Sequence, residues 1–305
     1  MPAAKSWVLL ANYLDKTMLR NALAFYLSKD SRLEWTPRSR FVELFFNGVA
    51  YGTYQLCEKV QVNTNRVNVS SNGWLIEVDA RATEDEPQFH TPHMGCPFRV
   101  EWPEDDDLTD DRFAQIKAQF QQAEQALYAD NFTDPEHGWR KYFDEASVVD
   151  WFLVNEIAKN NDAAFFSSCY MHGELDGKIV FGPVWDFDIA FGNDYWEDSQ
   201  IDSPEGWHVR TTEWYWRFFQ DPSFVAAVQE QFKHYYSHRA EYNEYLGSLA
   251  AEMAPSAQTN ENIWHSMNVK FWNTPVVYGS YEAEVEALIK WFDARMEWMN
   301  ENIFL

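Results

Sequence analysis

An Asn-Gly pair between two β-rich runs is the feature of this sequence that most constrains its fold. Residues 41–46 read FVELFF, residues 47 and 48 are Asn-Gly, and residues 49–58 read VAYGTYQLCE. Asn and Gly tolerate the positive φ of a tight two-residue turn, so this pattern is the strongest short-range signal of an antiparallel hairpin. Residues 73–80, GWLIEVDA, indicate another strand. The first part of the chain therefore contains antiparallel β-structure.

Helical periodicity dominates the rest of the chain. Apolar residues recur at helical spacing in residues 12–29, from Thr109 onward, in residues 144–157 and in residues 211–305. Two strands, residues 165–172 and 178–184, are predicted around an Asp176-Gly177 turn. The acidic residues 83–110 are interpreted as a surface loop or a lobe boundary. This order predicts a small α+β part, then a mostly helical part with one inserted hairpin.

The charge of the chain argues against one class of partner. Twenty-four Lys and Arg against 48 Asp and Glu give a net charge of −24, so a nucleic-acid backbone would be repelled. Residues 1–70 carry nine basic and five acidic residues, and residues 71–305 carry 15 and 43, a net charge of −28. Basic peptides and metal cations are the better candidates, although a solvated acidic surface explains the charge equally well. Aromatic residues make up 17% of the chain, which indicates a large core or a carbohydrate-stacking surface.

Several familiar motifs are missing from the sequence. The three cysteines are scattered and the eight histidines are dispersed, so neither a disulfide framework nor a zinc site is expected. No run of 18 apolar residues predicts a membrane span, and Met1 to Tyr13 carries no convincing signal peptide. Phosphate-binding patterns such as GxxxxGK[ST] and GxGxxG do not occur.

The stretch from Asn160 to Asn193 carries the best candidate for chemistry. Asp162 follows a buried helix and precedes one strand of the predicted hairpin, while Asp186 and Asp188 follow the other strand. Pairing of these strands brings Asp162 close to Asp186, and an extended chain would point Asp186 and Asp188 to the same side. Three converging carboxylates favour a divalent cation such as Mg²⁺. The alternative is that these residues cap a turn and a loop.

Long stretches of the chain resemble the spore coat protein H (CotH) kinase family. The stretches are WVLLANYLDKTMLRNALAFYL (7–27), TPRSRFVELFFNGVAYGTYQLCEKVQVNTNRV (36–67), GWLIEVDAR (73–81), FGPVWDFDIAFGN (181–193) and KWFDARMEWMNENI (290–303). The resemblance implies an atypical protein-kinase-like, two-lobed α+β fold. In this sequence the N-terminal lobe would cover residues 1–82, and a larger, mostly helical C-terminal lobe would cover residues 83–305.

The resemblance also implies an activity and roles for particular residues. Family members transfer the γ-phosphate of ATP, with Mg²⁺ or Mn²⁺, to Ser residues of basic coat proteins. Asp162 takes the place of the catalytic-loop Asp, which orients the acceptor hydroxyl and accepts its proton. Asp186 takes the place of the metal-binding Asp, with Asp188 assisting, and Glu58-Lys59 would lie where backbone groups contact adenine. The family association suggests the spore coat, the cell surface or an extracellular location, although no signal peptide is visible in this sequence.

Two departures from the kinase pattern keep alternatives open. Ser167 stands where kinases place an Asn that binds a second metal ion, and a hydroxyl is a weaker ligand. Family members usually carry further strands before the matched part, including the one on which we expect the phosphate-binding Lys. The alternatives are a catalytically impaired pseudokinase that acts as a surface or coat assembly protein, and a carbohydrate-acting protein.

Overall fold

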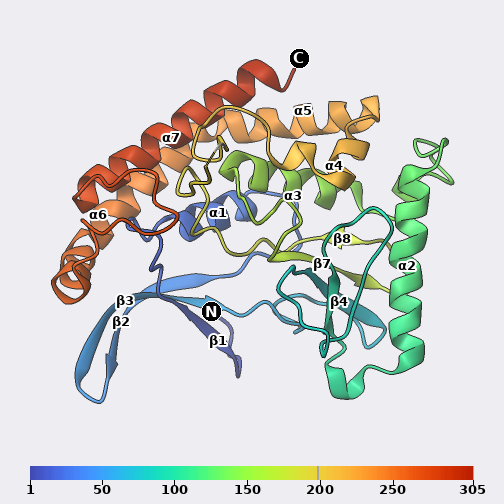
Figure 1. Ribbon diagram of the computed structural model, residues 1–305, viewed down its shortest axis with the longest axis horizontal. Coiled ribbons are helices and arrows are strands. Elements are labelled where there is room, and N and C mark those ends of the chain that lie inside the picture. Colours follow the sequence, from blue (N-terminus) through green and yellow to red (C-terminus); the bar gives the residue numbers. More distant parts are fainter. Residues whose placement is uncertain (198, 305) are drawn as a thin grey trace.

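The fold is built on two antiparallel sheets with helices packed around them (Figure 1). The computed structural model describes residues 1–197 and 199–304. The strands are β1 (Trp7–Leu10), β2 (Ser39–Phe46), β3 (Val49–Glu58), β4 (Gly73–Val78), β5 (Gln88–Phe89), β6 (Phe98–Trp102), β7 (Cys169–Glu174) and β8 (Val180–Phe181). The helices are α1 (Arg20–Lys29), α2 (Asp110–Tyr128), α3 (Glu145–Ala158), α4 (Glu213–Phe218), α5 (Pro222–Ser237), α6 (Arg239–Trp264) and α7 (Tyr281–Asn302). The α+β class predicted from the sequence is confirmed.

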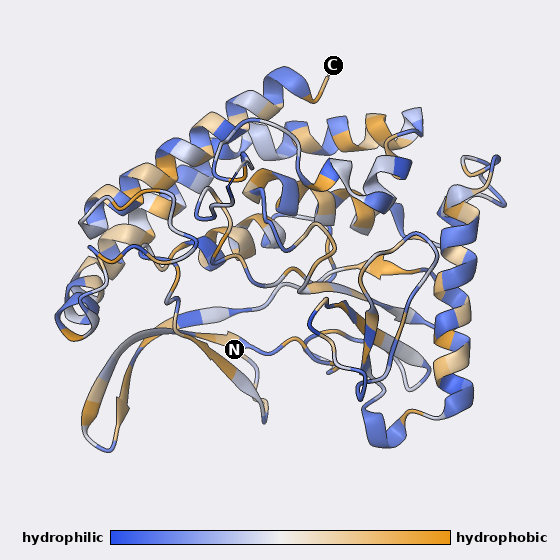
Figure 2. Ribbon diagram, viewed as in Figure 1, coloured by the Kyte–Doolittle hydropathy of each residue, from blue (hydrophilic) through white to orange (hydrophobic). Residues whose placement is uncertain are grey.

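The smaller sheet contains the predicted hairpin. Its strand order is β1-β3-β2, and β2 and β3 are joined by Asn47 and Gly48, whose φ angles are 50° and 77°. Gly48 has open space around it, so its positive φ rather than crowding explains the glycine. Strand β3 contacts the last part of α6, where Trp264 Nε1 donates to the Tyr51 carbonyl at 3.0 Å, while the turn of the hairpin projects beyond the helices (Figure 1). Figure 2 shows hydrophobic colouring along the hairpin. Phe45 and Phe46, next to the turn, are exposed to solvent.

The larger sheet has the strand order β5-β6-β4-β7-β8 and joins distant parts of the chain. Strand β4 pairs with β7 from Gly73 opposite Glu174 to Val78 opposite Cys169. Hairpin β7–β8 was predicted, and it forms around Asp176, whose φ is 63°. The predicted lobe boundary at residue 82 lies in the loop between β4 and β5, so this sheet contains strands from both sides of it.

Residues 83–110 depart from the expected irregular loop. They include β5 and β6, and Phe98 pairs with both Val78 and Phe89. The acidic residues that suggested a loop lie beside these strands, in the 3₁₀ turn Asp105–Asp107. Alternating burial of Phe98 and Val100 against the core explains why this segment forms a strand despite its charged surroundings.

The predicted helices are present, and side chains cap the starts of α2 and α3. Thr109 caps α2 by accepting a hydrogen bond from Arg112 N–H, and Asp144 caps α3 through Ser147 N–H. The helix predicted from residue 12 begins at Arg20, because the Asp15 carboxylate accepts hydrogen bonds from the N–H groups of Thr17 and Arg20 and holds a turn. No helix among the described residues combines the length and apolar character that crossing a membrane requires.

Aromatic side chains fill most of the core beneath the larger sheet. Trp74 of β4 packs edge-on against Phe120 of α2, with ring centroids 5.0 Å apart. On α3, Trp151 stacks on Tyr215 of α4, at 5.9 Å between centroids. The side chains of this core are almost fully buried. Such a stiff core fixes the two loops that leave α3 and β8, and these loops carry the predicted site residues.

Candidate functional site

The loop between α3 and β7 holds Asp162 at the edge of the core. Helix α3 ends at Lys159, which adopts a left-handed conformation with φ 48°, and the chain turns sharply there. The backbone carbonyl of Asp162 accepts hydrogen bonds from the N–H groups of Phe166 and Ser167, at 3.0 and 3.2 Å. Only 6% of Asp162 is exposed. Its backbone is therefore held from both sides, as a precisely placed carboxylate requires.

A second loop, after β8, carries the other two predicted carboxylates. The side chains of Asp186 and Asp188 interact with each other, and each affects the pKa of the other. The premise of an extended chain is wrong, because Asp186 has φ 62°, and the interaction between the two side chains does not depend on strand alternation. The side-chain amide of Asn160 donates to the Asp186 carbonyl at 3.2 Å and ties the two loops together.

Burial raises the pKa values of all three carboxyl groups, and repulsion by a neighbouring carboxylate adds to the effect for Asp162 and Asp188. Burial, followed by the charge of Asp186, raises the pKa of Asp162 to about 6. The same two causes raise the pKa of Asp188 to about 7. Burial also raises the pKa of Asp186, against the effect of the Arg81 guanidinium. These interactions place Asp162, Asp186 and Asp188 in one electrostatic cluster, as the hairpin pairing predicted.

Arg81 and Asp79 join this cluster from the end of β4, and the sequence did not reveal their part in it. The Ala80 N–H donates to the Phe166 carbonyl at 2.7 Å, which fastens the end of β4 to the Asp162 loop. Arg81 Nη1 donates to Ser167 Oγ at 3.3 Å, and Asp79 Oδ1 lies 3.5 Å from the same hydroxyl. Arg81 lowers the pKa of both Asp162 and Asp186. Strand β4 ends beside this loop only because it pairs with β7, a contact that spacing along the chain does not show.

The donor atoms at this site fit a hard divalent cation. Asp186 and Asp188 supply two carboxylates that already approach within hydrogen-bonding distance. The Oδ1 atom of Asn160 is buried and has no hydrogen-bond partner among the described residues. All of these donors are oxygens, which Mg²⁺ and Mn²⁺ prefer, and a cation would stabilise the charged forms of Asp186 and Asp188, whose pKa values are raised. Asp186 and Asp188 would hold the ion, with Asn160 as a neighbouring oxygen donor.

Glu58 and Lys59 lie at the end of β3, where internal contacts occupy part of their backbone. The Glu58 carboxylate is buried and accepts two hydrogen bonds from the Arg38 guanidinium, at 2.8 and 2.9 Å. The Glu58 N–H donates to the Arg38 carbonyl at 3.0 Å, and the Lys59 carbonyl accepts from Arg66 at 3.0 Å. A contact of these residues with adenine stays a prediction, and it has to use the remaining backbone groups.

A pocket of about 760 Å³ opens beside Asp162. Its lining includes Arg81 and Phe166 together with Trp196, Trp207 and Trp272. Trp196 and Trp272 are 52% and 61% exposed, with ring centroids 6.1 Å apart. The pocket thus combines a buried carboxylate with exposed aromatic rings.

The ammonium group of Lys159, which also lines this pocket, is fully engaged within the protein. It donates hydrogen bonds to the carbonyls of Gln200, Ser203 and Glu205. Arg81 is therefore the cation of this pocket that faces the carboxylates.

Comparisons with known proteins identify the family. A search of curated proteins found no match. A family model described as CotH kinase protein matches residues 1–299 of the 305. The match covers both sheets, the cluster around Asp162 and Asp186, and nearly all of α7. The chain therefore belongs to the CotH kinase family.

Proposed function

We propose that this protein is an ATP-dependent protein serine kinase that requires Mg²⁺ or Mn²⁺ and phosphorylates basic proteins. The observation that carries the proposal is the division of the acidic cluster into two parts. Asp186 and Asp188 are joined to each other, whereas Asp162 stands on a separate, rigid loop close to both. A kinase needs this division, because one group binds the metal and another handles the acceptor hydroxyl.

Asp186 and Asp188 are the proposed metal ligands, with Ser167 as a weaker one. A cation held by these residues would neutralise charge that develops on the phosphates of ATP during transfer. Both carboxylates would have to be ionised to hold the cation. Arg81 lies next to Ser167 and acts on both Asp162 and Asp186, so it is placed to hold the γ-phosphoryl oxygens. Glu58 and Lys59 are the proposed contacts for adenine.

Asp162 is the proposed catalytic carboxylate. The acceptor Ser oxygen forms a bond to the γ-phosphorus while the bond to the ADP oxygen breaks, and the Ser proton passes to the Asp162 carboxylate. Since the pKa of Asp162 is about 6, the group is mostly ionised at neutral pH and can accept that proton. The rigid loop contributes most by aligning the hydroxyl for in-line attack.

The pocket beside Asp162 is the proposed entrance for the acceptor. Residues 71–305 have a net charge of −28, which favours a basic segment over an acidic one. The exposed rings of Trp196 and Trp272 offer surfaces on which Lys or Arg side chains can lie. A spore coat or other extracellular protein rich in basic residues is the class of acceptor that this family membership suggests.

Two alternatives make different use of the same residues. A pseudokinase that serves in surface or coat assembly would bind ATP without transferring phosphate, or bind no nucleotide. The exposed tryptophans beside an acidic group are the observation that favours a carbohydrate-acting protein. Such a protein would bind glycans and not nucleotides.

The test is phosphate transfer from ATP to a Ser peptide flanked by Lys and Arg. The full chain is incubated with peptide, ATP and either Mg²⁺ or Mn²⁺, and mass spectrometry follows the added phosphate on peptide and protein. Transfer that stops when EDTA is added supports the proposal. If nucleotide binds but no phosphate is transferred with either metal, the pseudokinase is favoured. If glycans bind and nucleotides do not, the carbohydrate-acting protein is favoured.

A further inference from the structure

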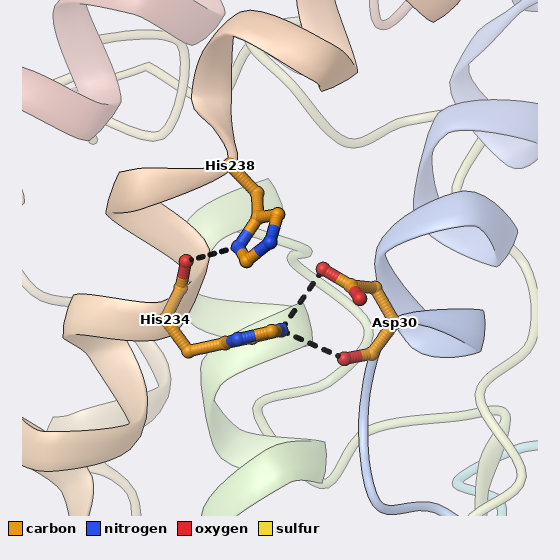
Figure 3. Close-up of side chains that lie close together, drawn as sticks. All are labelled: Asp30, His234 and His238. Atoms are coloured by element: carbon orange, nitrogen blue, oxygen red, sulfur yellow. Dashed lines mark hydrogen bonds and ion pairs between the residues drawn. The ribbon is translucent and has the colours of Figure 1, made fainter.

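A second candidate metal site lies away from the acidic cluster. Asp30, His234 and His238 each offer a ligand atom, and these three atoms lie within 4.8 Å of one another. Among residues 1–197 and 199–304, no other group of three His, Cys, Asp or Glu side chains meets this condition. Figure 3 shows the two imidazole rings side by side and facing Asp30. We call these three residues the His–Asp cluster.

The fold assembles the His–Asp cluster from two distant segments. Asp30 caps the C-terminal end of α1. His234 lies in the last turn of α5, and His238 stands between α5 and α6. The spacing of four residues puts both imidazoles on one side of the helix end, which is a common arrangement for a metal-binding pair. The dispersed histidines gave no reason to expect a zinc site, because the third ligand comes from 204 residues away.

Hydrogen bonds orient each ligand of the His–Asp cluster. His238 Nδ1 lies 2.8 Å from the His234 carbonyl and donates to it, which leaves the Nε2 lone pair of the neutral ring available. The Tyr242 hydroxyl donates to Asp30 Oδ2 at 2.6 Å. His234 Nε2 faces the same Asp30 oxygen at 3.0 Å. In metal sites, hydrogen bonds of this kind between a ligand residue and its neighbours fix the orientation of the imidazole rings and the basicity of the ligands.

The electrostatic surroundings favour a cation. The cluster lies at the C-terminal ends of both α1 and α5, where carbonyl groups carry partial negative charge. The Asp30 carbonyl itself lies 3.2 Å from His234 Nε2. Both the His234 and the Asp30 side chains are about one-third exposed, at 36% and 34%, so an ion can reach them from solvent.

We propose that the His–Asp cluster binds a zinc ion through His234 Nε2, His238 Nε2 and an Asp30 carboxylate oxygen. Two imidazoles and one carboxylate suit Zn²⁺ and not Mg²⁺, which prefers an all-oxygen set. Ligand atoms around tetrahedral zinc are about 3.3 Å apart, so the 3.0 Å between His234 and Asp30 needs little adjustment. The ion would replace the proton that His234 shares with Asp30. It would clamp α1 to the α5–α6 junction, and it does not depend on the proposed kinase reaction.

The experiment uses the full, metal-free chain and Co²⁺ as a spectroscopic probe for Zn²⁺. Titration should produce a visible absorption band typical of tetrahedral cobalt that saturates at one equivalent and disappears when Zn²⁺ is added. Saturating Zn²⁺ should raise the melting temperature by about 3–6 °C. His238→Ala should weaken binding by more than about tenfold, and Asp30→Asn should weaken it as well.

Matched variants separate this site from the acidic cluster. His90→Ala, which changes an exposed histidine elsewhere, should bind Co²⁺ like the wild type. Asp186→Asn should also keep the cobalt band. Circular dichroism checks that each variant folds. The proposal is overturned if the wild type binds no Co²⁺ or Zn²⁺, or if His238→Ala and Asp30→Asn, both folded, bind as tightly as the wild type.

Discussion

Glu156 and Arg295 form an ion pair whose two side chains are fully buried, with Arg295 Nη2 lying 2.7 Å from Glu156 Oε1. The pair joins α3, which precedes the Asp162 loop, to α7 near the end of the chain. Glu156 also accepts hydrogen bonds from the N–H groups of His208 and Arg210, both at 2.8 Å. Arg295 donates to the carbonyls of Pro204 and Gly206. One buried pair thus fixes the segment that forms part of the pocket beside Asp162.

Replacement of Arg295 by Met should be strongly destabilising. It leaves Glu156 as a buried charge without its partner and removes the donors to three backbone carbonyls. Loss of one partner of a buried pair costs about 3–5 kcal/mol. The measurement is urea unfolding of both proteins, with Arg239→Met as the control, because Arg239 forms an exposed ion pair. A loss below about 1 kcal/mol for Arg295→Met would mean that the pair contributes little.

Local signals in the sequence predicted much of the fold. The Asn47-Gly48 and Asp176-Gly177 turns mark hairpins that form, and the helices expected from Thr109 and from residue 144 begin one residue later. Strand β7 begins at Cys169 rather than at residue 165. These signals act over a few residues, so the amino-acid pattern contains them in full. The pairing of β4 with β7 joins residues that are 91 positions apart at Val78 and Cys169 and 101 apart at Gly73 and Glu174. No local pattern encodes that contact, and Arg81 therefore stayed unnoticed.

The sequence predicted the candidate site about as far as it predicted the fold: it indicated contacts within one hairpin and missed contacts between distant segments. Asp162 and Asp186 are linked by one hairpin, and hairpin pairing placed them together correctly. The contact between Asp186 and Asp188 was expected for the wrong reason, since Asp186 is left-handed rather than extended. The His–Asp cluster was missed, although His234 and His238 have a spacing that can bind metal. Their partner Asp30 meets them only through the packing of α1 against the helical part.

Removal of the Asp186 charge should abolish metal-dependent nucleotide binding. Asp186→Asn is preferred to an Ala variant, because Asn tolerates the φ of 62° at this position. The variant keeps the shape but loses one proposed carboxylate ligand of the cation. Stability should not fall, because repulsion within the acidic cluster is reduced.

Calorimetry with ATP, in the presence and absence of Mg²⁺, measures this effect. Asp106→Asn is a suitable control, since Asp106 is an exposed carboxylate in a 3₁₀ turn. Nucleotide binding that is equally tight and equally metal-dependent in Asp186→Asn and the wild type would contradict the metal assignment.

Asp188 should make the metal-free protein less stable as the pH rises. Its pKa is about 7 in the folded protein, against about 3.9 for an unfolded Asp. Below pH 4 both states are protonated and the group has no effect. Between pH 4 and 7 the unfolded state releases its proton first, so the free energy of unfolding falls as the pH increases.

In the Asp188→Asn variant, the free energy of unfolding should not fall in this way as the pH rises. Its melting temperature should match that of the wild type near pH 4 and exceed it by a few degrees, about 2–6 °C, near pH 7. Thermal melts in EDTA at pH 4, 5.5 and 7 provide the comparison. A difference between the two proteins that does not change with pH is the result that speaks against a raised pKa for Asp188.

The acceptor should be selected by charge. Residues 71–305 carry a net charge of −28, so a Ser peptide flanked by Lys or Arg should be phosphorylated faster than one flanked by Asp or Glu. The preference should weaken as salt increases, because exposed charges are screened. Initial rates with the two peptides at low and high salt test this. Equal rates at low salt would exclude charge as the basis of acceptor choice.

Asp162→Asn separates a catalytic carboxylate from a residue that merely holds a turn. Asn keeps the size of the side chain and caps turns about as well as Asp, so the turn interpretation predicts unchanged stability and activity. The catalytic interpretation predicts that ATP binding persists while turnover falls by a factor on the order of 10² or more. Because burial raises the pKa of Asp162 to about 6, wild-type turnover should also decline as the pH drops through that value.

The measurement is phosphate transfer to the basic Ser peptide across pH 5–8, with nucleotide affinity determined separately. Comparable turnover in wild type and Asp162→Asn would remove the catalytic role and leave the pseudokinase as the better description, whereas a loss of turnover with intact ATP binding assigns the proton-accepting step to this carboxylate.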